Sequence, residues 1–467
     1  MTKRNFFYDW LCKSRKGQKT ADTKAYTVLN DRTLSLMKSH NLVGNFFHYR
    51  TAIEILGWEY SDVFEEGRLD LDPDKWADFG PANFQLGPPA GVSKSLKRIT
   101  TNKNLVPYPP NLVPSLRDIA SKALFKRSCS RNFEISCTEG AHASVAYSVM
   151  TFVNPGDEVI ITDPGYFFLE PPVLVAGGRV KRVILTEKSG YRINVESLKK
   201  KITPKTKMII ICDPINPFGT IQTKDELKEI VRIANKYNII VLDNITHSFH
   251  RLNERVKHHP MSALDKVDTR NVITITGLSH GFGLAGLRIG FMAGHPDLLG
   301  PILAMESALT RVNINLLMQY GAQAALEDKE YFPRCAKKLK RNLSILEDIV
   351  DNNPLLSFVV KPDYGYVTCI DTSKIKASCQ ELTVALLKRK CAVYPSDGLG
   401  DTKSTSYLRL NFSTPRREHF RWLEKALPEA IEEAESGEHR KAVIDFFRSV
   451  GTKRSEKIIK ILKDIDR

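Results

Sequence analysis

The run Met208-Ile209-Ile210-Ile211-Cys212 decides the fold class, because consecutive apolar residues are typical of a strand buried on both faces of a parallel sheet. An amphipathic helix pattern follows at 227–237, and another short apolar strand pattern occupies 239–242. Strand patterns also occur at 133–137, 157–162 and 272–276. Strands that alternate with helices predict an α/β domain with a mostly parallel, mixed sheet flanked by helices.

The pattern changes after about residue 300. A long helical stretch is predicted for 301–350, and a smaller α+β unit follows, with strands near 356–360, 367–370 and 407–411. We therefore predict an N-terminal arm (1–80), a large domain (81–345), a small domain (346–430) and a charged amphipathic C-terminal extension (431–467). Apolar residues of the extension recur at helical spacing. This spacing predicts helices packed on the protein's own surface or on a second copy, in preference to membrane attachment.

The composition of the 467 residues, with 42% apolar and 26% charged, is typical of a soluble globular protein. No apolar run reaches the length of a transmembrane helix, and the basic N-terminus lacks the apolar core of a secretory signal. Eight scattered cysteines without a CxxC pair favour reduced thiols in a cytoplasmic protein. The net charge of +16 would suit nucleic acid or an anionic membrane, but we expect most of it on solvated helix faces, and neither partner is favoured.

Two glycine-containing segments are candidates for binding a phosphate group. Thr138-Glu139-Gly140-Ala141-His142 leads from a strand into an apolar helix, and backbone N–H groups at a helix N-terminus bind phosphate readily. An ordinary turn between a strand and a helix would show the same sequence pattern. The segment Gly277-Leu278-Ser279-His280-Gly281-Phe282-Gly283-Leu284-Ala285-Gly286-Leu287-Arg288-Ile289-Gly290 also matches a dinucleotide-binding fingerprint. We reject that match, because its glycines lead into another apolar run and not into a βαβ helix.

With three further motifs, these segments resemble the fold-type I pyridoxal-phosphate (PLP) aminotransferases over about residues 80–430. The further motifs are Asp163-Pro164-Gly165-Tyr166, Asn216-Pro217-Phe218-Gly219, and Asp243 at the end of the 239–242 strand. The resemblance implies a large PLP-binding domain with a smaller one and an amino acid or keto acid substrate. It also implies a homodimer with its sites at the subunit interface.

The resemblance also implies a set of coenzyme-binding residues. The phosphate falls to Gly140, Ala141, His142, Ser279 and Arg288, with Tyr108 reaching it from a neighbouring subunit. Tyr166 lies over the pyridine ring, Asn216 binds its 3′ oxygen, and Thr246 stands where a tyrosine usually supports that oxygen. Asp243 pairs with the ring nitrogen and is a predicted catalytic residue, since this charge pair makes the ring an electron sink.

A substrate site is implied in the same way. Arg409, between Leu408 and Leu410, resembles the arginine that clamps the α-carboxylate of the substrate with a bidentate pair. Gly87 lines this site, and Asn216 contributes to it as well.

The decisive departure from the family is His280, which occupies the position of the lysine that carries the coenzyme as an imine. An imidazole has no primary amine, so PLP or its amine form, pyridoxamine phosphate (PMP), must bind noncovalently. A histidine still exchanges protons near neutral pH, which predicts that His280 is a catalytic proton shuttle. Gly277 and Thr246 also depart from the family pattern.

Three functions remain open from the sequence. The favoured one is an aminotransferase-like enzyme acting on an amino acid. A PLP- or PMP-dependent lyase or dehydratase, in which elimination replaces amino transfer, is one alternative. A noncatalytic pseudoenzyme that keeps the fold is the other. A metal site at His247, His250, His258 and His259 is not favoured, because no cysteine or acid cluster completes a ligand set.

Overall fold

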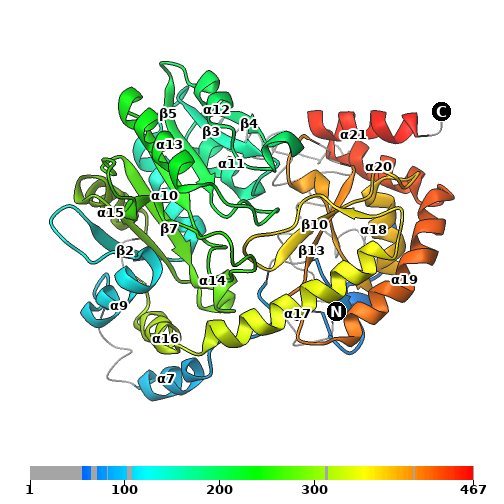
Figure 1. The fold of residues 1–467 in the computed structure, drawn as a ribbon, viewed down its shortest axis with the longest axis horizontal. Coiled ribbons are helices and arrows are strands. Elements are labelled where there is room, and N and C mark those ends of the chain that lie inside the picture. Colours follow the sequence, from blue (N-terminus) through cyan, green and yellow to red (C-terminus); the bar gives the residue numbers. More distant parts are fainter. Residues whose placement is uncertain are drawn as a thin grey trace, which may run out of the picture.

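The computed structural model describes residues 55–64, 71–80, 83–101, 108–310, 314–402 and 405–465. Its largest element is a seven-stranded sheet in the order β2-β8-β7-β6-β5-β3-β4 (Figure 1). The strands are β2 (Glu134–Thr138), β3 (Glu158–Asp163), β4 (Arg179–Ile184), β5 (Thr206–Cys212), β6 (Ile240–Asn244), β7 (Val272–Gly277) and β8 (Gly290–Gly294). Only β8 runs antiparallel to its neighbours in this sheet, so the predicted mostly parallel, mixed sheet is confirmed.

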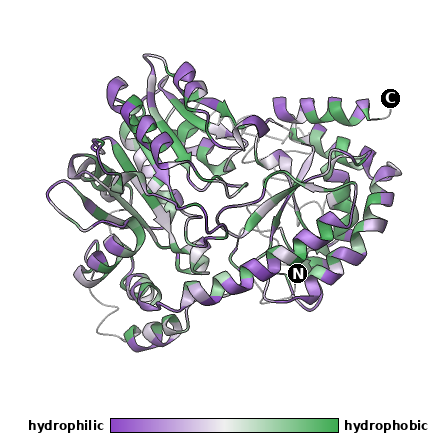
Figure 2. Cartoon of the chain, in the orientation of Figure 1, coloured by the Kyte–Doolittle hydropathy of each residue, from purple (hydrophilic) through white to green (hydrophobic). Residues whose placement is uncertain are grey.

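The inner strand β5 is buried on both faces. Ile209 and Ile211 pack in one apolar cluster with α13 (Lys224–Tyr237), whereas Met208 and Ile210 pack in another with α10 (Ala141–Phe152) and α15 (Pro296–Thr310). Figure 2 shows the strands as hydrophobic and the outer helix faces as hydrophilic. This two-sided burial explains why the strand has no polar alternation.

Helix α13 illustrates how local sequence sets the elements around the sheet. It begins at a capping box, in which Thr223 accepts from the Glu226 amide and Glu226 accepts in return from the Thr223 amide. It ends at Asn238, which adopts a left-handed conformation with φ of 53°. The other helices of this part of the chain are α7 (Gly91–Ile99), α9 (Pro114–Phe125), α11 (Glu170–Val175), α12 (Val195–Lys201), α14 (Leu278–Gly281), α16 (Leu316–Glu327) and α17 (Tyr331–Asp351).

A second, smaller unit is built on a four-stranded antiparallel sheet in the order β12-β13-β10-β9. Its strands are β9 (Ser357–Phe358), β10 (Val367–Asp371), β12 (Tyr394–Pro395) and β13 (Tyr407–Asn411). The N-terminal segment contributes α6 (Tyr60–Val63) and β1 (Ala77–Asp78), and β1 pairs in parallel with β11 (Cys391–Ala392). Residues 1–54 of the predicted arm lie outside the described residues.

The C-terminal helices pack on this smaller unit. Apolar side chains of α20 (Arg440–Val450) and α21 (Lys453–Asp464) form a cluster with Val384 of α18 (Cys379–Lys388). They follow α19 (Glu418–Glu435), as Figure 1 shows in orange and red. The extension therefore packs on the protein's own surface, one of the two arrangements that its helical spacing predicts.

Two expectations about element boundaries can be compared with the helices of the structure. The predicted long helical stretch over 301–350 is three helices, α15, α16 and α17, separated at Asn315 and around Asp328. The predicted domain borders at 346 and 431 fall inside α17 and α19 and not between elements. The division into domains stays a prediction. No helix among the described residues is long and apolar enough to cross a membrane.

Candidate functional site

The sheet topology brings the predicted motifs to one edge. Strands β2, β3, β5, β6 and β7 all end at the same side, and β8, which runs the other way, begins there. The residues that follow these strand ends carry most of the predicted site. Ligands of open α/β sheets bind at this carboxyl edge, so the sheet order explains why distant motifs meet.

The N-terminus of α10 forms a cradle with Arg288. The guanidinium donates to the Glu139 carbonyl at 3.4 Å and to the Ser279 hydroxyl at 3.5 Å. Gly140 has φ of 105°, and a Cβ there would lie 2.8 Å from Arg288 Nη2, so only glycine permits this approach. The first amides of α10, which belong to Ala141 and His142, lack intrahelical acceptors. The predicted phosphate-binding residues are therefore together at the start of a helix, next to a cation.

Asp243 is fully buried and only half satisfied. Its Oδ2 accepts from the Met261 amide at 2.8 Å and from the Thr274 hydroxyl at 3.0 Å. Its Oδ1 has no hydrogen-bond partner among the described residues. Burial raises the pKa of Asp243 to about 7, against the two hydrogen bonds that lower it. A buried carboxylate oxygen of this kind fits a protonated ring nitrogen, which would supply both a donor and a charge.

His280 lies in a chain of polar rings. Its Nδ1 is 2.7 Å from the Tyr366 hydroxyl, and its ring stacks on His247 with centroids 4.9 Å apart. His247 Nε2 lies 3.3 Å from the Asn216 amide nitrogen. Burial and then the neighbouring His280 lower the pKa of His247 well below its ordinary value, so the His247 ring is neutral near pH 7.

Tyr166 and Thr246 are two further residues of the predicted coenzyme site. Burial raises the pKa of Tyr166 to about 12, while Arg409 and Arg288 both act to lower it. The Thr246 amide and hydroxyl both donate to Asn244 Oδ1. In this structure the Thr246 hydroxyl proton is thus directed at Asn244.

Arg409 is buried in β13, with 3% of its surface exposed. Its Nη2 donates to the Gly80 carbonyl at 3.1 Å, its guanidinium lies 4.4 Å above the Tyr394 ring, and its Nε has no partner among the described residues. A buried guanidinium with a donor to spare fits a carboxylate. Gly87 lies beside the His280 segment, because a Cβ on Gly283 would come within 2.9 Å of the Gly87 carbonyl carbon.

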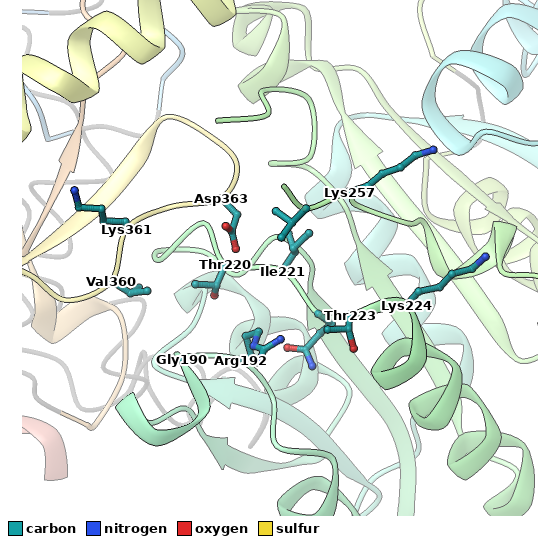
Figure 3. A pocket seen from close by; sticks show the side chains of 12 residues that line it. Gly190, Arg192, Thr220, Ile221, Thr223, Lys224, Lys257, Val360, Lys361 and Asp363 are labelled. Carbon is teal, nitrogen blue, oxygen red and sulfur yellow. The ribbon is translucent and has the colours of Figure 1, made fainter. Parts of the chain in front are cut away.

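Tyr108 is not brought to this group, since its side chain is 75% exposed. A cavity of about 400 Å³, lined by residues such as Arg192, Thr220 and Asp363, lies elsewhere (Figure 3). None of the predicted site residues lines it. In Figure 3 the Lys257 and Lys361 amino groups point away from its centre.

Two residues that contact His280 were not predicted to belong to the site. The sequence suggested His247 only as a metal ligand that was not favoured. Its place just after β6 could have marked it as a residue of the sheet-edge site. Tyr366 precedes β10 of the smaller unit, and nothing in its sequence context points to His280.

Among the described residues, one group has metal-ligand spacing, Glu433, Glu438 and His439. Lys388 Nζ lies 2.7 Å from Glu433 and 3.1 Å from Glu438, so an ammonium already neutralises the acids.

The mixed α/β sheet, with candidate ligand-binding residues at its carboxyl edge, indicates the class of protein. Comparison with known proteins identifies the family. Residues 75–425 match the family model for aminotransferase class I and II, and the chain belongs to that family. An aspartate aminotransferase of Pyrococcus abyssi is 28% identical over 69% of this chain and 83% of its own length. An aromatic-amino-acid aminotransferase of Thermococcus litoralis is 25% identical over the same shares.

Solved structures agree on the fold. An aromatic aminotransferase from Pyrococcus horikoshii superposes with a TM-score of 0.69, at 24% identity over 78% of this chain and 96% of its own. An aspartate aminotransferase from Thermus thermophilus with maleate gives 0.70 at 21% identity, over 87% and 99%. A PLP-bound putative aminotransferase from Clostridium difficile gives 0.69 at 21% identity, over 77% and 93%. These similarities confirm the predicted fold class and family.

Proposed function

We propose that this protein is an aminotransferase-like enzyme that binds PLP or PMP noncovalently and acts on an amino acid. The observation that carries the proposal is the buried Oδ1 of Asp243, which lacks a partner among the described residues at the edge where the α10 cradle also lies. His142 Nδ1, Asn216 Oδ1 and Arg409 Nε are buried and unpartnered within the same described residues. Such groups are costly unless a ligand satisfies them.

The residues present fit the coenzyme. When bound, it supplies an electron sink for the carbanion at the substrate Cα. The α10 N-terminus and Arg288 would bind its phosphate. Asp243 would hold the proton on its ring nitrogen, and Tyr166 would bind its flat face. Arg409 would bind the substrate carboxylate and so orient the Cα–H bond.

His280 replaces the lysine as the group that moves protons. The contact at Nδ1 with Tyr366 and the stack on His247 fix the plane of the imidazole. We assign His280 the transfer of a proton from and to the substrate carbon. The site lacks an amine at position 280 for covalent capture, so the coenzyme enters and leaves by binding alone.

Titration calorimetry with PLP and with PMP tests this proposal. Arg288→Met should weaken binding of either coenzyme by about tenfold or more, because a charge-assisted phosphate contact is lost. Arg192→Met is a matched control, since Arg192 lines the separate cavity of Figure 3 and should leave affinity unchanged. Absence of binding to the unmodified protein, or equal effects of both variants, would refute the proposed site.

The products distinguish the alternative reactions. Conversion of bound PLP to PMP by an amino acid, followed spectroscopically in a single turnover, supports amino transfer. Release of a keto acid with ammonia supports elimination, and coenzyme binding without turnover supports a noncatalytic role. The family match favours amino transfer as the expected result.

We also propose that the protein works as a homodimer, in which Tyr108 reaches the phosphate site of the second copy. The 75% exposure of Tyr108 supports this, because the ring has room for a partner. Sedimentation should give a dimer, and Tyr108→Phe should weaken PLP binding by a few fold while leaving the dimer intact. A monomer that binds PLP fully would contradict the proposal.

A further inference from the structure

A buried arginine of the C-terminal extension contacts a loop of the smaller unit, residues 396–402. Arg454, in the first turn of α21, is 6% exposed. Its Nε donates to Asp401 Oδ1 at 2.7 Å, and its Nη1 donates to the Asp397 carbonyl at 2.9 Å. One guanidinium thus holds both halves of the 396–402 loop.

The same loop is bonded to the turn that carries Tyr166. Asp163 accepts from the Asp401 amide at 3.0 Å and from the Thr402 amide at 3.2 Å. In the other direction, the Gly165 amide donates to the Leu399 carbonyl at 2.7 Å. The loop and the turn are tightly apposed, since a Cβ on Gly400 would lie 2.2 Å from Asp163 Oδ1.

The loop also begins at the predicted carboxylate site. Tyr394, just before it, lies beneath the Arg409 guanidinium and stacks on Phe167 with centroids 6.0 Å apart. The 396–402 loop therefore lies between the residues that precede Tyr166 and the strand that carries Arg409. A change in its position would move both of these neighbours.

We propose that Arg454 is a positioning residue, which fixes the 396–402 loop against Asp163 and thereby sets the place of Tyr166. The family model ends at residue 425, so α21 adds this contact to the matched fold from outside. The charge balance supports the arrangement. Burial would raise the pKa of Asp401, but Arg454 and Arg182 outweigh it and hold that pKa below its ordinary value. Asp401 is thus the ionised partner that a guanidinium binds best.

Hydrogen exchange of the full-length protein tests the first half of the proposal. In Arg454→Met, the Gly165, Asp401 and Thr402 amides should exchange about tenfold faster, because local opening no longer breaks the contacts to the guanidinium. Arg440→Met is the matched control, since Arg440 is a buried arginine of the same extension that binds Glu381 of α18. Both variants are compared equally far below their own unfolding midpoints. Equal exchange of these three amides in the two variants would overturn the proposal.

The second part of the proposal, that Arg454 sets the place of Tyr166, is tested by measuring PLP affinity. This part rests on the proposed function. Arg454→Met and Asp401→Asn should each weaken PLP binding several fold, and the double variant should add little to either, because both remove one interaction. Arg440→Met should bind PLP as the unmodified protein does. Faster amide exchange with unchanged PLP affinity would overturn the link to Tyr166. If the unmodified protein binds no PLP, the proposed function fails, while the exchange result still decides the role of Arg454 in the loop.

Discussion

Two neighbouring rings hold the His280 imidazole. Tyr366 contacts one ring nitrogen, and His247 covers the ring face. A planar ring is oriented by such stacking. The surroundings of position 280 therefore orient the imidazole, as the proposed proton transfer requires.

Restoring the amine gives a direct prediction. His280→Lys should acquire a covalent link to PLP that borohydride reduction makes permanent, detectable as a mass increase on the intact protein. The unmodified protein should show no such increase, because an imidazole cannot form the link. His250→Lys serves as the control, since His250 is a nearby histidine whose Nε2 contacts the Gly281 carbonyl at 2.9 Å. Reductive labelling of the unmodified protein would contradict noncovalent binding.

Asp243 leads to a pH-dependent prediction. Its pKa of about 7 means that the coenzyme-free folded protein holds a proton that the unfolded chain releases near pH 4. The stability that this proton gives is present at low pH and is lost as the pH rises through that window. Asp243→Asn removes the loss, so the variant should exceed the unmodified protein in stability by about 1–3 kcal/mol at pH 7.5 and by less at pH 5.

Thermal unfolding without coenzyme at the two pH values measures this difference. The same variant should also bind PLP about tenfold or more weakly, because an amide cannot stabilise the ring proton as a carboxylate does. A stability gap that is the same at both pH values would contradict the protonation of Asp243 in the folded protein.

Among the secondary-structure elements, α10 and β8 depend on close backbone contact. Gly290 begins β8 directly against the start of α10, and a Cβ there would lie 2.4 Å from the Gly140 carbonyl carbon and 2.5 Å from the Ala141 nitrogen. The amides proposed to bind phosphate are held in place by this packing. Close packing thus explains Gly281, Gly283 and Gly290 of the 277–290 segment without a dinucleotide.

Gly290→Ala should therefore cost about 1–3 kcal/mol of stability and weaken PLP binding, because the added methyl displaces the start of α10. Gly286→Ala is the control from the same segment, where an added Cβ meets nothing within 4 Å and the backbone is unstrained. Denaturant unfolding and PLP titration measure the two effects. Equal behaviour of the two variants would show that the β8–α10 contact does not shape the cradle.

In the molecule as a whole, the extension is joined to the smaller unit by a buried ion pair. Arg440 Nε lies 3.0 Å from Glu381 Oε1, and Glu381 is fully buried while its other oxygen caps α18. The apolar cluster around Phe446 and Phe447 packs beside it. The extension is thus part of the folded core and not an appended tail.

Removing one partner of this pair leaves a buried charge. Arg440→Met should cost about 3–5 kcal/mol in the free energy of unfolding, and adding Glu381→Gln should recover part of that loss because the stranded charge is gone. Denaturant unfolding of the single and double variants measures both. A double variant no more stable than Arg440→Met would argue that the loss comes from packing alone.

Much of the sheet could be predicted from sequence because its strands are apolar on both faces. The predicted strands near 133–137, 208–212 and 239–242 match β2, β5 and β6 to within a few residues. Strand β4 was missed, since the pattern Arg179-Val180-Lys181-Arg182 is polar on an edge of the sheet. The breaks between α15, α16 and α17 were also missed, because their apolar spacing continues across short connections.

The predicted roles of the site residues stay predictions, while the strand ends that carry many of them lie at one edge of the large sheet. Local sequence was enough to place Asp243 near the end of a strand and Asn216 and the 139–142 loop after strands, because hydrophobic runs mark where strands end. The contacts of His280 with Tyr366 and of Arg454 with Asp401 join residues 86 and 53 positions apart. Such pairings depend on which strands and helices become neighbours, and that is set by packing of the complete chain rather than by local patterns.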